Sequence, residues 1–75
     1  MKYYNSAGKP IPRDVAIAGL ITGSPLTVEV LRKSIKIERV DGEYEAGCQE
    51  HNSKCKMRTP LRALGWVEDH LRQYH

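Results

Sequence analysis

The sequence contains no phenylalanine and a single tryptophan, Trp66, so four tyrosines supply its other aromatic side chains. No apolar run approaches the roughly 20 residues that a membrane-spanning helix requires. The first ten residues, MKYYNSAGKP, lack the apolar stretch of a signal peptide. Without an export signal, the two cysteines are expected to meet a reducing environment. We therefore expect a cytoplasmic protein that makes no membrane contact.

The chain has 75 residues and a formal net charge of +3. A chain of this length forms one domain, which buries only about 60% of the surface that its unfolded form exposes. We expect an extended N-terminal arm or short strand over residues 1–11 and a single compact domain over residues 12–75. The charge is unevenly distributed, because residues 1–37 and 54–62 are mainly basic and residues 38–50 are mainly acidic. A mildly basic chain permits a polyanionic partner without requiring one.

Two helix-start signals occur in the first half of the chain. Pro12 suits a first helical turn, and Gly23 is typical of a helix end, so the sequence predicts a first helix between them. Its apolar residues cover most of its circumference, which predicts the central helix of the core. Ser24-Pro25 pairs a capping serine with a proline and predicts a second helix to Ser34. Residues 12–34 would then form a helix-turn-helix.

The segment 35–48 has the alternating pattern of a β-hairpin. Asp41-Gly42 is a strong turn signal, because a type I′ turn requires positive φ at both central residues. In the register that this turn implies, Ile37 faces Ala46 and Cys48 lies on the apolar side. A polar loop is expected next, over residues 49–58. Thr59-Pro60 then predicts a last helix whose inward stripe is Leu61, Leu64, Val67 and Leu71.

These elements predict a small α+β domain with the order helix, helix, β-hairpin, helix. The fold class is a helix-turn-helix of winged-helix-like form with an additional C-terminal helix. The two strands must pack on the helices, because an isolated hairpin is only marginally stable in water.

Residues 48–55, CQEHNSKC, offer candidate metal ligands. Cys48, His51 and Cys55 have local zinc-type spacing, and His70 could supply the fourth ligand that a structural zinc site requires. The usual pattern pairs two such knuckles, and this stretch has only half of it. A Cys48–Cys55 disulfide is a further alternative if the protein is exported. We interpret Cys48 as a small core residue and Cys55 as a loop thiol, and we expect no cofactor.

The first functional hypothesis is a small DNA-binding regulator that binds double-stranded DNA. The predicted second helix would enter the major groove, and the basic loop over residues 54–62 would contact phosphates at a helix N-terminus. A homodimer is expected if the site has two half-sites. The acidic hairpin argues against a DNA-contacting wing. The nucleic-acid-binding candidates are Thr27, Arg32, Lys33, Lys54, Lys56, Arg58 and Arg62.

The alternative hypothesis is a protein-binding adaptor or inhibitor, acting through the acidic hairpin (35–48) or the N-terminal arm. An exposed hairpin edge can accept a partner's strand, although acidic residues there also protect an edge from aggregation. An enzyme is not expected, because no phosphate loop or nucleophile motif is present. The partner-binding candidates are Tyr3, Tyr4, Glu38, Glu43 and Glu45.

Overall fold

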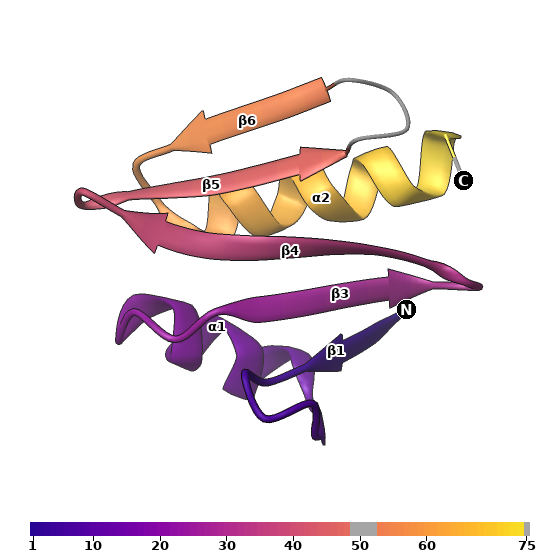
Figure 1. Cartoon of the computed structure of the whole chain (residues 1–75), viewed down its shortest axis with the longest axis horizontal. Helices are drawn as coiled ribbons and strands as arrows, with labels where there is room; N and C mark the ends of the chain where they lie inside the picture. Colours follow the sequence, from indigo (N-terminus) through magenta and orange to yellow (C-terminus); the bar gives the residue numbers. More distant parts are fainter. Residues whose placement is uncertain (49–52, 75) are drawn as a thin grey trace.

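The structure is a computed structural model, and it describes residues 1–48 and 53–74. Six strands form a single sheet in the order β2-β1-β3-β4-β5-β6, and each pair of neighbours is antiparallel. Helices α1 and α2 contact each other, and both pack against strands of this sheet (Figure 1). The elements in chain order are β1 (Lys2–Tyr4), β2 (Pro10–Ile11), α1 (Arg13–Ile21), β3 (Leu26–Val30), β4 (Lys33–Val40), β5 (Glu43–Cys48), β6 (Ser53–Met57) and α2 (Pro60–Tyr74).

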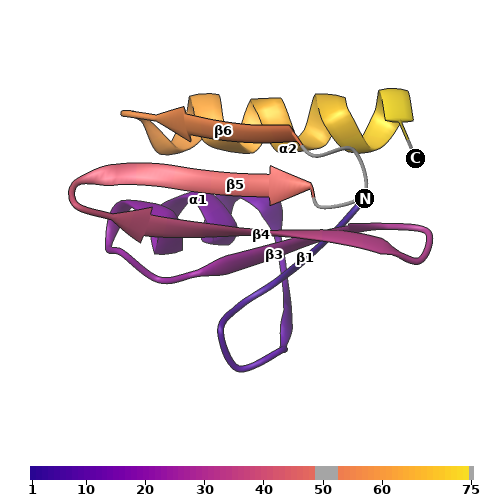
Figure 2. The same cartoon turned by 45° about the horizontal axis from the view of Figure 1, so that its top comes forward.

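One face of the sheet forms the core with the two helices. Apolar side chains alternate along the strands, and the buried members meet across strand pairs such as Leu26–Ile37 and Ile37–Ala46. Helix α2 lies alongside β5 and β6 in both views of the molecule (Figures 1 and 2). It contributes a buried stripe with the spacing of one helix face. That stripe consists of Ala63, Leu64, Val67 and Leu71.

The predicted helix-turn-helix is wrong, and with it the order helix, helix, hairpin, helix. Residues 26–30 form strand β3, and residues 33–40 form strand β4. The Gly-Ser-Pro signal ends α1 and does not start a second helix. Gly23 adopts a φ of 92°, and the backbone N–H of Ser24 donates to the carbonyl of Gly19 at 2.9 Å. After that helix end, the alternation of Leu26, Val28 and Val30 suits a strand with one buried face.

The predicted hairpin is confirmed in position and register. Val40 pairs with Glu43, and Ile37 pairs with Ala46. Asp41 and Gly42 have φ values of 52° and 79°, as a turn with two left-handed residues requires. The hairpin is not an isolated wing, because β3 and β6 flank it within the larger sheet.

Three smaller expectations also need correction. The predicted polar loop contains strand β6 over residues 53–57. Helix α1 is not the centre of the core, because Val15 and Ile21 are exposed on its outer side. Leu61 is 56% exposed, so the inward stripe of α2 begins at Ala63. The predicted helix start after Thr59 is confirmed, and the N-terminal arm joins the sheet as β1 and β2.

Candidate anion-binding surface on strand β6 and helix α2

The two faces of the sheet differ in what covers them. Residues that point away from the helices on β4, β5 and β6 are mainly charged and exposed or half-buried. We call this side the open face. It results from the alternation of each strand, because neighbouring residues of a strand point to opposite sides. The open face of these three strands carries Ser34, Lys36, Glu38, Val40, Glu43, Glu45, Gly47, Lys54 and Lys56.

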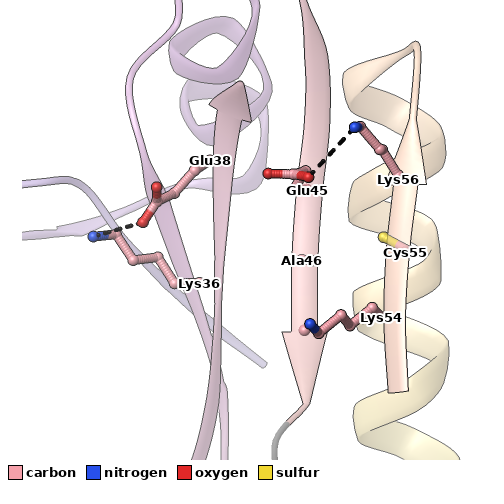
Figure 3. A pocket seen from close by; sticks show the side chains of 8 residues that line it. Lys36, Glu38, Glu45, Ala46, Lys54, Cys55 and Lys56 are labelled. Atoms are coloured by element: carbon pink, nitrogen blue, oxygen red, sulfur yellow. Dashed lines mark ion pairs between the residues drawn. The ribbon is translucent and has the colours of Figure 1, made fainter. Parts of the chain in front are cut away.

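A groove of about 450 Å³ lies on the open face (Figure 3). Lysines from β4 and β6 line it, and Gly47 of β5 lies between the two strands. Two ion pairs flank the groove. The Nζ atom of Lys36 lies 3.1 Å from Oε1 of Glu38, and the Nζ atom of Lys56 lies 3.7 Å from Oε1 of Glu45. Both pairs are exposed, so each contributes only about 0.2–1 kcal/mol to stability.

Four basic residues follow one another along the chain from this groove to the start of α2. Lys54 and Lys56 are exposed on β6, Arg58 is exposed in the turn, and Arg62 is exposed in the first turn of α2. We call Lys54, Lys56, Arg58 and Arg62 the basic track. All four are residues that the sequence predicts for nucleic-acid binding. The structure places them on a strand and a helix start, and not in a loop.

The first turn of α2 adds to the positive potential of the basic track. Thr59 precedes the helix, and its Oγ1 accepts a 3.4 Å hydrogen bond from the backbone N–H of Arg62. Its carbonyl accepts from the N–H of Ala63 at 3.2 Å. No acidic residue occupies the first turn of α2. The partial positive charge of this helix end is therefore not offset by a carboxylate of that turn.

The other three predicted nucleic-acid contacts do not lie on a helix. Thr27 is half-buried in β3, Arg32 is exposed in the turn between β3 and β4, and Lys33 begins β4. In the sheet, Arg32 and Lys33 lie at the end where β5 stops and β6 begins. Arg58 and Arg62 lie toward the opposite end of β6. The structure therefore does not bring these predicted contacts together with the end of the basic track.

The predicted partner-binding residues also separate into different environments. The Tyr3 hydroxyl donates to the carboxylate of Glu68 on α2, so Tyr3 belongs to the helix-covered side. The Tyr4 hydroxyl lies 3.4 Å from Oε1 of Glu29. Glu38 and Glu45 form the ion pairs beside the groove, and Glu43 is half-buried on β5. Two of the three predicted hairpin carboxylates therefore already have a lysine partner.

The candidate metal ligands are largely core residues. Cys48, Cys55 and His70 are all buried, and His70 stacks on Trp66 with 5.0 Å between ring centroids. Burial raises the pKa of the Cys55 thiol, which favours its protonated form over the thiolate that binds metals. Within residues 1–48 and 53–74, no three His, Cys, Asp or Glu side chains form a metal-binding group. His51 lies outside the described residues.

The structure corrects the interpretation of Cys55 as a loop thiol, because Cys55 faces the core from β6. Cys48 and Cys55 are thiols in the described chain. Cys55 pairs with Ala46 across the sheet, and Cys48 pairs with Ser53. The two cysteines are therefore diagonal neighbours on adjacent strands, about 7–8 Å apart. That separation exceeds the usual distance between bridged cysteines.

Sequence reasoning missed a cluster of Tyr3, Arg13 and Glu68. The Glu68 side chain is 7% exposed, and Nε of Arg13 lies 2.9 Å from its Oε2 while Nη2 lies 3.1 Å from its Oε1. Burial alone would raise the pKa of Glu68. The hydrogen bonds from Arg13 and Tyr3 and the charge of Arg13 bring that pKa below its ordinary value. The three residues are far apart in sequence, so no local pattern indicates the cluster.

Comparisons with known proteins do not identify a family or a function for this chain. No protein-family model, curated protein or solved structure matches this chain. In the described parts of the chain, neither helix is both long and apolar enough to cross a membrane.

Proposed function

We propose that this protein binds the phosphate backbone of a nucleic acid through the basic track. The supporting observation is that Lys54, Lys56, Arg58 and Arg62 are all exposed and follow one another along the chain from β6 into the first turn of α2, with no acidic residue in that segment. Phosphate contacts dominate nucleic-acid affinity, and lysine and arginine side chains supply most of them. Arginine can also bind a phosphate through two parallel hydrogen bonds.

The proposed binding mode depends on phosphates and not on base sequence. A helix in the major groove would read base edges, but the segment predicted to form that helix consists of strands. Phosphate contacts fix position and orientation without carrying sequence information. We therefore propose a protein that binds the nucleic-acid backbone and not a sequence-specific regulator.

The expectation of a homodimer depended on a DNA site with two half-sites, and a protein that binds only the backbone does not require such a site. The proposed compartment is the cytoplasm, where a reducing environment keeps Cys48 and Cys55 as thiols.

Fluorescence anisotropy with a labelled random duplex tests the proposal. We expect affinity to fall steeply between roughly 50 and 200 mM salt. Lys56 is paired with Glu45, so phosphate contacts by the other three members of the basic track predict a slope of about −2.7 for the logarithm of affinity against that of salt concentration. Duplex DNA and duplex RNA of the same sequence are compared, because both offer the same phosphate chemistry. The relative affinities identify which nucleic acid the surface fits.

Charge-neutralising variants locate the contacts. Arg58→Gln and Arg62→Gln should each reduce the magnitude of the salt slope by about 0.9. Lys9→Gln is the matched control, because it removes the same charge from an exposed site near β2, at the other edge of the sheet from β6. Equal losses of duplex affinity in all three variants would show that binding responds to the net charge alone. That result, or no salt-dependent binding by the unmodified protein, would contradict the proposal.

A protein partner is the second candidate, and the exposed glutamates of the open face favour it. Glu38 and Glu45 would both have to exchange their lysine partners for those of a basic surface, whereas in the basic track only Lys56 has a carboxylate partner among the described residues. For this reason we rank the protein partner second. Glu45→Gln separates the two candidates. Removing this carboxylate should strengthen nucleic-acid binding by reducing repulsion, whereas it should weaken binding to a basic protein.

A further inference from the structure

The groove on the open face has a floor without a side chain. Gly47 is exposed and lies on β5, between Lys36 of β4 and Lys54 of β6 in the groove lining. Lys54 and Lys56 extend from β6 toward β5 (Figure 3). Neighbouring strands are about 4.8 Å apart, so the backbones of β4 and β6 are about 10 Å apart on either side of Gly47, and side chains of both strands narrow the opening between them. The groove volume of about 450 Å³ is large enough for a group of the size of a phosphate.

The backbone conformation of residue 47 does not require a glycine. Among the described glycines, positive φ values occur at Gly8, Gly23 and Gly42, whereas Gly47 has ordinary strand backbone. Glycine within a strand weakens it and often marks a place where another group approaches the backbone closely. The absence of a side chain at the groove floor is thus the property that distinguishes Gly47 from its neighbours.

Within residues 1–48 and 53–74, the ion pairs of the groove leave one of its lysines without a carboxylate partner. Three lysines and two glutamates line it, which gives a net charge of +1. Lys36 pairs with Glu38, and Lys56 pairs with Glu45. Among the described residues, no carboxylate pairs with Lys54. The groove therefore complements a group with a single negative charge, such as a phosphodiester, better than a phosphomonoester with a charge of about −1.5 to −2.

We propose that this groove binds one phosphodiester of the nucleic acid, over the Gly47 backbone and against the ammonium group of Lys54. This inference rests on the proposed function, because Lys54 is also the first residue of the basic track. A strand rises about 3.3 Å per residue, so Lys54 and Met57 are about 10 Å apart along β6, and Arg58 follows in the turn. Phosphates of one strand follow each other every 3.4 Å or so along a duplex axis, and about three of them fit this distance.

Gly47→Val tests the groove directly. The valine side chain would fill the channel, while a β-branched residue at an exposed strand position should keep or raise the melting temperature. We expect weaker duplex binding and a salt slope smaller by about 0.9, which corresponds to the loss of one phosphate contact. Ser34→Val is the matched control, because Ser34 is exposed on the open face of β4 but does not line the groove.

A second measurement uses a probe that does not depend on duplex binding. Dimethyl phosphate carries the single charge of a phosphodiester, and amide chemical shifts can be followed by NMR during its titration. We expect shifts at Gly47 and Lys54 that are lost in Gly47→Val and retained in Ser34→Val. Lys54→Gln should also lose them, whereas Lys54→Arg should retain them.

The outcomes separate the two proposals. If Arg58→Gln weakens duplex binding but Gly47→Val binds as the unmodified protein does, the groove inference is overturned and the proposed function stands. Dimethyl phosphate shifts that persist in Gly47→Val also overturn the inference. If the unmodified protein does not bind a duplex in a salt-dependent way, the proposed function fails and the inference fails with it.

Discussion

The covered and open faces of the sheet are made by alternate residues of the same strands. On β4, Ile37 is buried against the helices, and Glu38 next to it is exposed. On β5, Ala46 is buried, and Gly47 next to it is exposed at the groove. The comparison shows how a short chain can build its core from one set of residues and leave the alternate set exposed. Residues facing the helices determine the free energy of unfolding, and residues on the open face are available for contacts with a ligand.

The helices produce this difference because they occupy one side only. Helix α2 contacts β3, β4, β5 and β6, whereas α1 contacts β1 and β3. Charged side chains would be costly on the covered side unless paired, and Glu68 there is held by Arg13 and Tyr3. On the open face, lysines and glutamates remain hydrated at little cost. Adjacent residues with opposite environments therefore provide matched pairs for experiments.

The largest contrast is expected between Ile37→Ala and Glu38→Ala. Ile37 is fully buried, so removing its side chain leaves a cavity and should lower the free energy of unfolding by about 2–5 kcal/mol. Glu38→Ala changes an exposed strand position and should stay within about 0.5 kcal/mol. Urea unfolding followed by circular dichroism measures both. Similar losses in the two variants would show that the open face is packed as tightly as the covered one.

Arg13→Gln should cost about 2 kcal/mol of unfolding free energy. A fully buried pair that loses one partner costs about 3–5 kcal/mol, but the Arg13 side chain is 49% exposed, which reduces the effect. The depressed pKa of Glu68 stabilises the folded protein above the unfolded value of 4.5, and this contribution is lost as pH falls through the folded pKa.

The same variant should weaken the pH dependence that Glu68 causes. Without Arg13, only the hydrogen bond from Tyr3 and the charge of Arg72 oppose the effect of burial, so the folded pKa of Glu68 should rise. The stability that Glu68 loses as pH falls through its folded pKa should then be smaller than in the unmodified protein. Unfolding free energies measured across this window, beside those of the Lys9→Gln control, show the size of the change. If the slope of unfolding free energy against pH were the same with and without Arg13, Arg13 would not be the main cause of the lowered pKa of Glu68.

Valine substitutions at two adjacent residues of β5 should have opposite effects. Ala46 is buried against the helices, so Ala46→Val overpacks the core and should cost about 1–3 kcal/mol. Gly47→Val places the same side chain on the open face and should leave stability unchanged or raise it. Thermal melting distinguishes them. A lower melting temperature for Gly47→Val than for Ala46→Val would mean that the two faces have been assigned incorrectly.

The smallest effect is expected at the exposed Lys56–Glu45 pair. A double-mutant cycle with Lys56→Ala and Glu45→Ala should give a coupling of about 0.2–1 kcal/mol, decreasing with salt. Both side chains are roughly half exposed, which limits the gain from pairing. A coupling well above 1 kcal/mol would show that this part of the open face is more protected from solvent than the structure indicates.

Local signals predicted two parts of the fold and misled at a third. Asp41-Gly42 located a hairpin, and Thr59-Pro60 located a helix start. The second hairpin, between β3 and β4, was missed because its turn has no such signal. Leu31 adopts a φ of 58° there although it has a Cβ atom and is exposed. Ser24-Pro25 then favoured a helix where a strand forms.

The candidate site was predicted in part. The basic residues from Lys54 to Arg62 were found from composition and from the helix start that follows them. Strand β6 was missed, although SKCKM alternates basic and apolar residues, because so short a pattern occurs in loops as well. The groove could not be predicted, because it depends on Lys36, Gly47 and Lys54 coming together from three strands.

The sequence by itself determined the Asp41-Gly42 turn and the helix starts after Pro12 and Thr59, because these depend on backbone preferences within a few residues. Asp41-Gly42 favours positive φ locally, and a proline in the first turn favours a helix start locally. Only the tertiary structure decided that residues 26–30 form a strand, since its buried face needs the helices to cover it. It also decided the Arg13–Glu68 pair, whose members are 55 residues apart. Contacts over such distances depend on how the whole chain packs, and no local pattern records them.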